Sequence, residues 1–166
     1  MTILLAIPIL GCLLILQTAV LNQIPLLQGT ADLVLLAVVA WAVQKRVRTA
    51  WGWGLIGGLI VGYVSAVPSG VYLLCYLAAT GIAILLRQRI WNVPLLAMFL
   101  ATFLSTIVLH GVTMLTLRLD DSLISIGESI NLITLPSLLL NMILAVPFFT
   151  LFNDLANLVY PESLEM

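Results

Sequence analysis

The residues of this chain that are best suited to chemistry are polar side chains repeated along one apolar segment. Four of them follow at steps of four, four and three residues: Thr102, Thr106, His110 and Thr113. This spacing places them on one side of a helix. A later apolar segment carries Asn141, so hydrogen bonds between the two helices are expected. The alternative is a polar pocket in which His110 is the ionisable member.

Small residues form a second regular pattern in another apolar segment. They stand at strict four-residue steps: Gly54, Gly58, Gly62, Ala66 and Gly70. Small side chains allow two helix backbones to approach closely, so the stripe predicts a packing seam. We favour a neighbouring helix of the same chain over another protein, because the apolar segments must first pack against one another.

Asp32 is an acidic residue at the start of an apolar segment, two residues after Thr30. A hydroxyl can cap a helix at such a position, and a carboxylate is favoured by the positive end of the helix dipole. The alternative is a functional carboxylate that grips a partner or an ion, because an acidic group at membrane depth is costly unless something pairs with it.

The sequence lacks the common catalytic and cofactor-binding motifs. It has no phosphate-binding Gly-x-x-x-x-Gly-Lys, no His-Glu-x-x-His and no Gly-x-Ser-x-Gly. Cys12, Cys75 and the single histidine do not form a metal-ligand cluster. No charged residue stands in the middle of an apolar segment, which disfavours carriers that relay charge. We therefore expect a binding or scaffolding protein, neither an enzyme nor a holder of cofactor or metal.

The composition is that of a membrane domain. Of the 166 residues, 63% are hydrophobic and 8% are charged, and the mean hydropathy is +1.23. Six stretches approach the roughly 20 apolar residues that a span of about 30 Å requires. They are Ile3–Leu21, Leu26–Val43, Trp53–Val67, Val71–Leu86, Val93–Leu117 and Leu132–Phe152. The sequence thus predicts one all-α transmembrane domain over residues 1–166. Because the third and fourth stretches are short, a four-span chain with a re-entrant middle pair is the alternative.

Basic residues gather in two of the connections between these stretches. They are Lys45, Arg46 and Arg48 after the second stretch, and Arg87 and Arg89 after the fourth. The positive-inside rule places both connections, and therefore both termini, in the cytoplasm. We interpret these charges as topology signals in contact with lipid headgroups, not as a site for nucleic acid. Four tryptophans stand near these connections and are expected to anchor the cytoplasmic boundary: Trp41, Trp51, Trp53 and Trp91.

Several short motifs follow one another in an order found in a known family. A polar run that includes Gln17 precedes Ala31-Asp32-Leu33, and the glycine-rich stretch from Gly54 to Gly58 comes next. Then follow Ser65, Pro68, Gly70 and Tyr76, and finally Pro136-Ser-Leu-Leu-Leu-Asn141 with Pro147 and Phe148. This layout resembles the rod shape-determining MreD family of bacteria, which usually has Pro-Asp-Leu at the position of residues 31–33. A departure is Gly62, where members commonly carry an aspartate.

The resemblance implies a non-enzymatic component of the bacterial cytoplasmic membrane that serves cell elongation. Such a protein binds the bitopic protein MreC and helps to link MreB to peptidoglycan synthesis by RodA and a class B penicillin-binding protein. Asp32 is the residue that carries over as a possible partner contact. The family's fold is similar to the S-component of energy-coupling-factor transporters, so capture of a vitamin-sized molecule is the alternative function. A structural accessory subunit of a larger membrane complex is a second alternative.

Overall fold

The computed structural model describes residues 3–19, 28–65, 67–90, 92–119 and 126–161, and these segments are helical without a β-strand. The helices are α1 Ala6–Ala19, α2 Leu33–Val43, α3 Ala50–Val64, α4 Ser69–Arg89, α5 Pro94–Leu119, α6 Ile126–Ser129, the π-helix η2 Ile130–Thr134 and α7 Leu135–Val159. Each predicted apolar stretch thus contains one main helix. The parts of the predicted stretches at residues 20–21, 26–27 and 66 lie outside the described residues.

Three helices are long and apolar enough to cross a membrane: α4, α5 and the continuous helical stretch Gly127–Val159. Three apolar helices are shorter, with 14 residues in α1, 11 in α2 and 15 in α3. The prediction that the fourth segment is short was wrong, because α4 has 21 residues. Its last turn holds Arg87 and Arg89, and basic side chains are favoured at the carboxyl end of a helix.

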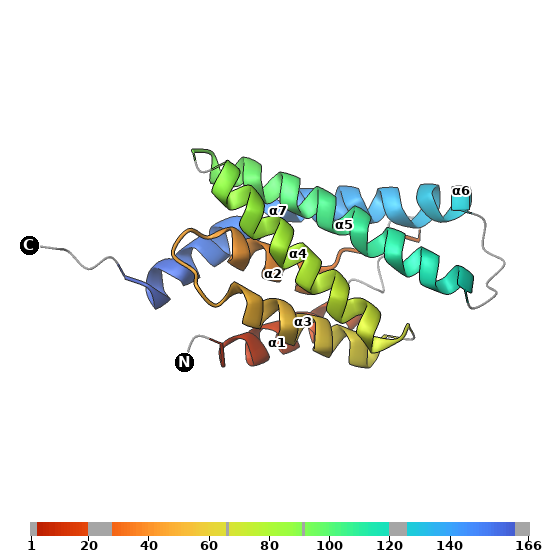
Figure 1. Ribbon diagram of the computed structural model, residues 1–166, viewed down its shortest axis with the longest axis horizontal. Coiled ribbons are helices and arrows are strands. Elements are labelled where there is room, and N and C mark those ends of the chain that lie inside the picture. Colours follow the sequence, from red (N-terminus) through yellow and green to blue (C-terminus); the bar gives the residue numbers. More distant parts are fainter. Residues whose placement is uncertain (1–2, 20–27, 66, 91, 120–125, 162–166) are drawn as a thin grey trace, which may run out of the picture.

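Helix α2 is the centre of the bundle. All of its residues are buried, none exposing more than 4% of its surface, and it lies against α1, α3, α4, α5 and α7 (Figure 1). A helix that is apolar all round requires protein on every side, which α2 has. With about 1.5 Å of rise per residue, its 11 residues cover about half of a 30 Å hydrocarbon layer. Residues 28–32 are not helical, so the predicted start of this helix was too early.

Both described termini lie at one end of the bundle. Figure 1 shows the start of α1 and the end of α7 at the same end as the α2–α3 and α4–α5 connections. Ring contacts agree, because Trp41 near the end of α2 lies 6.3 Å from Tyr160 between ring centroids. We call this the basic end, since it carries the basic connections. The arrangement of the helices is compatible with the predicted even number of crossings.

The tryptophan prediction was wrong for two of the four residues. Trp41 and Trp53 are fully buried and stack on each other, with ring centroids 4.6 Å apart. Phe152 of α7 packs edge-on against both rings. These indoles fill the core beneath the basic end instead of anchoring a boundary. Trp51 is 54% exposed, as an anchor would be, and Trp91 lies outside the described residues.

The small-residue stripe lies against α4. A side chain at Gly58 would come within 2.8 Å of the Leu73 backbone, and one at Gly62 within 2.9 Å of the Ser69 backbone. A side chain at Gly54 would also meet α4, at the side chain of Thr80. The neighbour is therefore a helix of the same chain, and we call Gly54, Gly58 and Gly62 the glycine seam.

One member of the predicted stripe is not part of this seam, and another lies outside the described residues. Gly70 belongs to α4 itself, and the space beside it is open to at least 4 Å. Ala66 lies outside the described residues. Gly57 was missed, although a side chain there would meet Val38 and the ring of Tyr76. The seam packs α3 against α4, and Gly57 packs α3 against α2 and the ring of Tyr76.

Candidate functional site

The non-helical backbone before α2 is held by side chains from two other helices. Its partly buried N–H groups need partners, because apolar surroundings offer none. The Thr30 N–H donates to Ser137 Oγ at 3.1 Å, and the Asp32 N–H donates to Asn141 Oδ1 at 2.9 Å. The Leu33 N–H donates to Gln17 Oε1, also at 2.9 Å. Polar residues of α1 and α7 therefore replace the missing helical hydrogen bonds.

Asp32 is the N-cap of α2 and the meeting point of these contacts. Its Oδ1 accepts the backbone N–H of Leu35 at 2.9 Å, which satisfies one of the free donors at the helix start. The Tyr76 hydroxyl donates to the same carboxylate, at 2.9 Å from Oδ1 and 3.1 Å from Oδ2. The expectation that a hydroxyl caps this helix was wrong, since the Asp32 carboxylate is the cap and Thr30 donates its backbone N–H to Ser137. We call these side chains the Asp32 cluster: Gln17, Asp32, Tyr76, Ser137 and Asn141.

Asn141 extends the cluster to the polar stripe of α5. It is fully buried, and its Nδ2 donates to Thr106 Oγ1 at 3.1 Å. This is the expected hydrogen bond between the two helices. Thr102 is also buried, but its hydroxyl has no partner among the described residues. The stripe is therefore divided: its first half packs between helices, and its second half meets a cavity.

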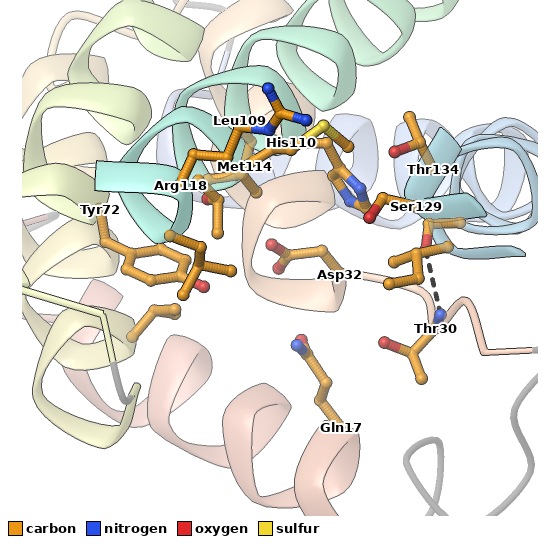
Figure 2. Close-up of a pocket in the computed structure, with 15 residues that line it drawn as sticks. Gln17, Thr30, Asp32, Tyr72, Leu109, His110, Met114, Arg118, Ser129 and Thr134 are labelled. Carbon is orange, nitrogen blue, oxygen red and sulfur yellow. Dashed lines mark hydrogen bonds between the residues drawn. The ribbon is translucent and has the colours of Figure 1, made fainter. Parts of the chain in front are cut away.

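A cavity of about 300 Å³ lies beside the cluster (Figure 2). Its lining includes the end of α3 and the start of α4, so it lies at the end of the bundle opposite the basic end. Asp32, His110, Thr113 and Arg118 line it, together with Gln17. The lining also includes hydroxyls of α6 and the start of α7 and apolar side chains of α5. Figure 2 shows these side chains converging from α1, α4, α5 and the segment before α2.

The cavity joins opposite charges on a largely apolar wall. Asp32 is a hydrogen-bond acceptor, and Arg118 is a cation with several donors. The Thr113 hydroxyl oxygen is buried without a partner among the described residues and belongs to the lining. Small-molecule sites have this design, with few polar groups in a mostly apolar concavity of about 300 to 1,000 Å³. The arrangement suits binding. Across the described residues, His, Cys, Asp and Glu side chains do not gather into a group that could hold a metal ion.

The basic residues do not all lie in loops. Arg87 belongs to α4, and its Nη1 donates to the carbonyl oxygens of Gln44 at 2.7 Å and Val47 at 3.1 Å. It therefore closes the carboxyl end of α2. Lys45, Arg46 and Arg48 are exposed in the α2–α3 connection, and Arg89 is exposed at the end of α4. Trp91 nearby, and Asp120 and Asp121 beyond α5, lie outside the described residues.

Sequence reasoning named part of this site and missed the rest. Asp32, His110 and Thr113 were singled out, and the structure places all three at the cavity. Tyr76 and Gln17 were noted as motif residues without a role, and Arg118 was not singled out as a site residue. A glutamine within the apolar segment Ile3–Leu21 was a usable signal, because buried polar groups in such a segment need partners.

Comparison with known proteins adds no relative. The chain matches no family model, and no curated protein or solved structure is similar to it at a significant level. The resemblance to a known family therefore stays a prediction from the chain's own motifs.

Proposed function

We propose that this protein is a non-enzymatic scaffold of the bacterial cell-elongation machinery and a member of the MreD family. The observation that carries the proposal is the convergence of its motifs. Gln17, Asp32, Tyr76 and Asn141 come from four stretches that resemble the family, and all four meet in the Asp32 cluster. Unrelated short matches would have no reason to share one hydrogen-bonded site, so this meeting supports a common origin of the motifs.

The same proposal includes the topology. Six membrane crossings, both termini in the cytoplasm and the fold of transporter S-components fit three long and three shorter apolar helices with both described termini at the basic end. The short helices α2 and α3 need not span hydrocarbon alone, because α2 is enclosed by protein. The proposed location is the bacterial cytoplasmic membrane, with the basic end on the cytoplasmic side.

The proposed partners are membrane proteins, not nucleic acid. The large exposed side chains of α1, α4, α5 and α7 are mostly aliphatic, a surface suited to lipid chains or to a transmembrane helix. We propose that the single span of an MreC-like protein packs on this surface. By binding this partner, the chain helps to link MreB to peptidoglycan synthesis by RodA and the class B penicillin-binding protein.

Deletion of the gene tests this function in living cells. Loss of the scaffold is expected to turn rod-shaped cells into wide, round cells, because elongation synthesis is no longer directed along the side wall. Cell width and length, measured by microscopy, are the readout, and a plasmid copy of the wild-type gene is the control. Unchanged rods in the deletion strain would refute the scaffold function.

The cavity favours a second candidate, capture of a small molecule as in a transporter S-component. It combines Asp32, His110 and Arg118 with a mostly apolar wall, and its volume of about 300 Å³ suits a vitamin-sized ligand. This function would use the same helices as the scaffold.

A thermal-shift screen tests the second candidate. With pantothenate, nicotinate, thiamin and biotin as probes, a true ligand is expected to raise the melting temperature of the wild-type protein, because it binds only the folded state. His110→Ala is expected to abolish this shift. Thr116→Ala is the matched control, since Thr116 lies on the same helix outside the lining and its hydroxyl donates to the carbonyl of Val112 one turn earlier. No shift with any probe, or equal shifts in both variants, would count against capture by this cavity.

A further inference from the structure

A second cavity lies at the basic end and belongs to neither the Asp32 cluster nor its cavity. Its volume is about 200 Å³. It is formed by three separate parts of the chain: the residues at the end of α2, the first residue of α5 and the second half of α7. Lys45 and Arg46 line it from the α2–α3 connection.

The charged groups around this cavity favour an anion. The charged side chains in the lining, Lys45 and Arg46, are both cations, and Asp154 on α7 is not part of the lining. Pro94 in the lining is the first residue of the 26-residue helix α5, whose amino end carries partial positive charge. The opposing carboxyl end of α2 would repel an anion, but the Arg87 guanidinium binds the carbonyl oxygens of Gln44 and Val47. Three sources of positive charge thus face one space.

The lining also changes character along α7. Phe149, Asn153 and Asn157 stand at steps of four residues, so they share one face of the helix. The face is apolar deeper in the bundle and offers two amide groups toward the basic end. Amides donate hydrogen bonds to oxygen anions, and a phenyl ring suits a glyceride or an acyl chain. A phospholipid has the same order of groups, with an anionic head above an apolar tail.

We propose that this cavity binds a phosphate group, namely the headgroup of an anionic phospholipid such as phosphatidylglycerol. Basic pockets between transmembrane helices near the headgroup level are known to hold such lipids. Lys45, Arg46 and the amino end of α5 bind the phosphate, Asn153 and Asn157 donate to its oxygens or to the glycerol, and Phe149 contacts the start of the acyl chain. The inference is independent of the scaffold proposal, because it requires a membrane at this end and no protein partner.

Native mass spectrometry of the detergent-purified chain tests the site. Phosphatidylglycerol is expected to remain bound to the wild-type protein, whereas phosphatidylcholine of equal chain length binds at least fivefold less. The double variant K45A/R46A is expected to lose at least fivefold in phosphatidylglycerol binding. The matched control is R48A/R89A, which removes the same charge from exposed positions outside the lining. Equal losses in the two double variants would overturn the site, because the net charge alone would then explain binding.

Two further measurements keep the result decisive. Asn157→Asp places a negative charge in the lining and is expected to lose the lipid. Because Asn157 is exposed, this variant is expected to stay monodisperse even if K45A/R46A aggregates. Inorganic phosphate is the second probe. Phosphate that displaces phosphatidylglycerol from the wild-type chain only at high millimolar concentration supports the lipid as the ligand. Tighter binding of inorganic phosphate than of the lipid would overturn that assignment.

Discussion

Alanine at Asp32 is expected to lower the free energy of unfolding by about 3 kcal/mol. Loss of the N-cap of α2 costs about 1 kcal/mol, and loss of the charged hydrogen bond from Tyr76 costs about 2 kcal/mol. Tyr76 is fully buried and the carboxylate is half-buried, so water cannot replace the carboxylate fully as a partner of the hydroxyl. For a chain of this size, the melting temperature should fall by about 6–12 °C, measured by thermal unfolding in detergent.

Asparagine at the same position is the control that separates geometry from charge. The amide oxygen of the new side chain can still accept from the backbone N–H of Leu35 and from the Tyr76 hydroxyl, and asparagine is as good an N-cap as aspartate. Asp32→Asn is therefore expected to lose less than half as much stability as Asp32→Ala. Equal destabilisation by the two variants would contradict the capping role and would point to a requirement for the charge itself.

Leucine at Gly58 is expected to disrupt the bundle even more. The first carbon of the new side chain would lie 2.8 Å from the Leu73 Cα, and a backbone atom cannot move aside as a flexible side chain can. Helices α3 and α4 would have to separate, which displaces Tyr76 from Asp32. Overpacking of this kind costs about 1–3 kcal/mol, and loss of the Tyr76 hydrogen bond adds about 2 kcal/mol. The yield of monodisperse protein in size-exclusion chromatography should fall several-fold.

Gly111→Leu is the matched control for this prediction. Gly111 lies within α5, is exposed and has open space where a side chain would be added. Replacing this glycine by leucine favours the helix by up to about 1 kcal/mol and creates no clash. The control should purify as well as the wild-type chain. A normal yield of Gly58→Leu would mean that α3 and α4 do not pack through the glycine seam.

The helices and the seam could be predicted from the sequence because both depend on local periodicity. Apolar stretches show where helices lie, and small residues at every fourth position must share a helix face. The length of α2 could not be predicted in this way. A buried half-helix and a membrane span are both apolar all round, and what surrounds them decides between the two. The burial of Trp41 and Trp53 in the core could not be predicted either, because it too depends on what surrounds the helices.

Only those contacts of the candidate site that join residues close in the sequence could be predicted. Asp32 has the residue type and position of an N-cap, and its contact with Leu35 spans three residues. Its other partners come from distant segments: Tyr76 is 44 residues away, and Asn141 is 109 residues away. Such contacts depend on how the helices pack, which no pattern in one segment encodes. The position of Arg118 at the cavity also depends on helix packing, so it could not be predicted from one segment.

Co-purification with the bitopic MreC-like protein of the same organism tests the central claim most directly. The two chains are co-expressed, this chain is captured by a tag in mild detergent, and the partner is quantified by mass spectrometry against an unrelated single-span protein. The scaffold account predicts a stable complex that elutes as one peak, forms with Gly111→Leu and excludes the unrelated protein. Elution of the folded wild-type chain without the MreC-like protein would contradict the account.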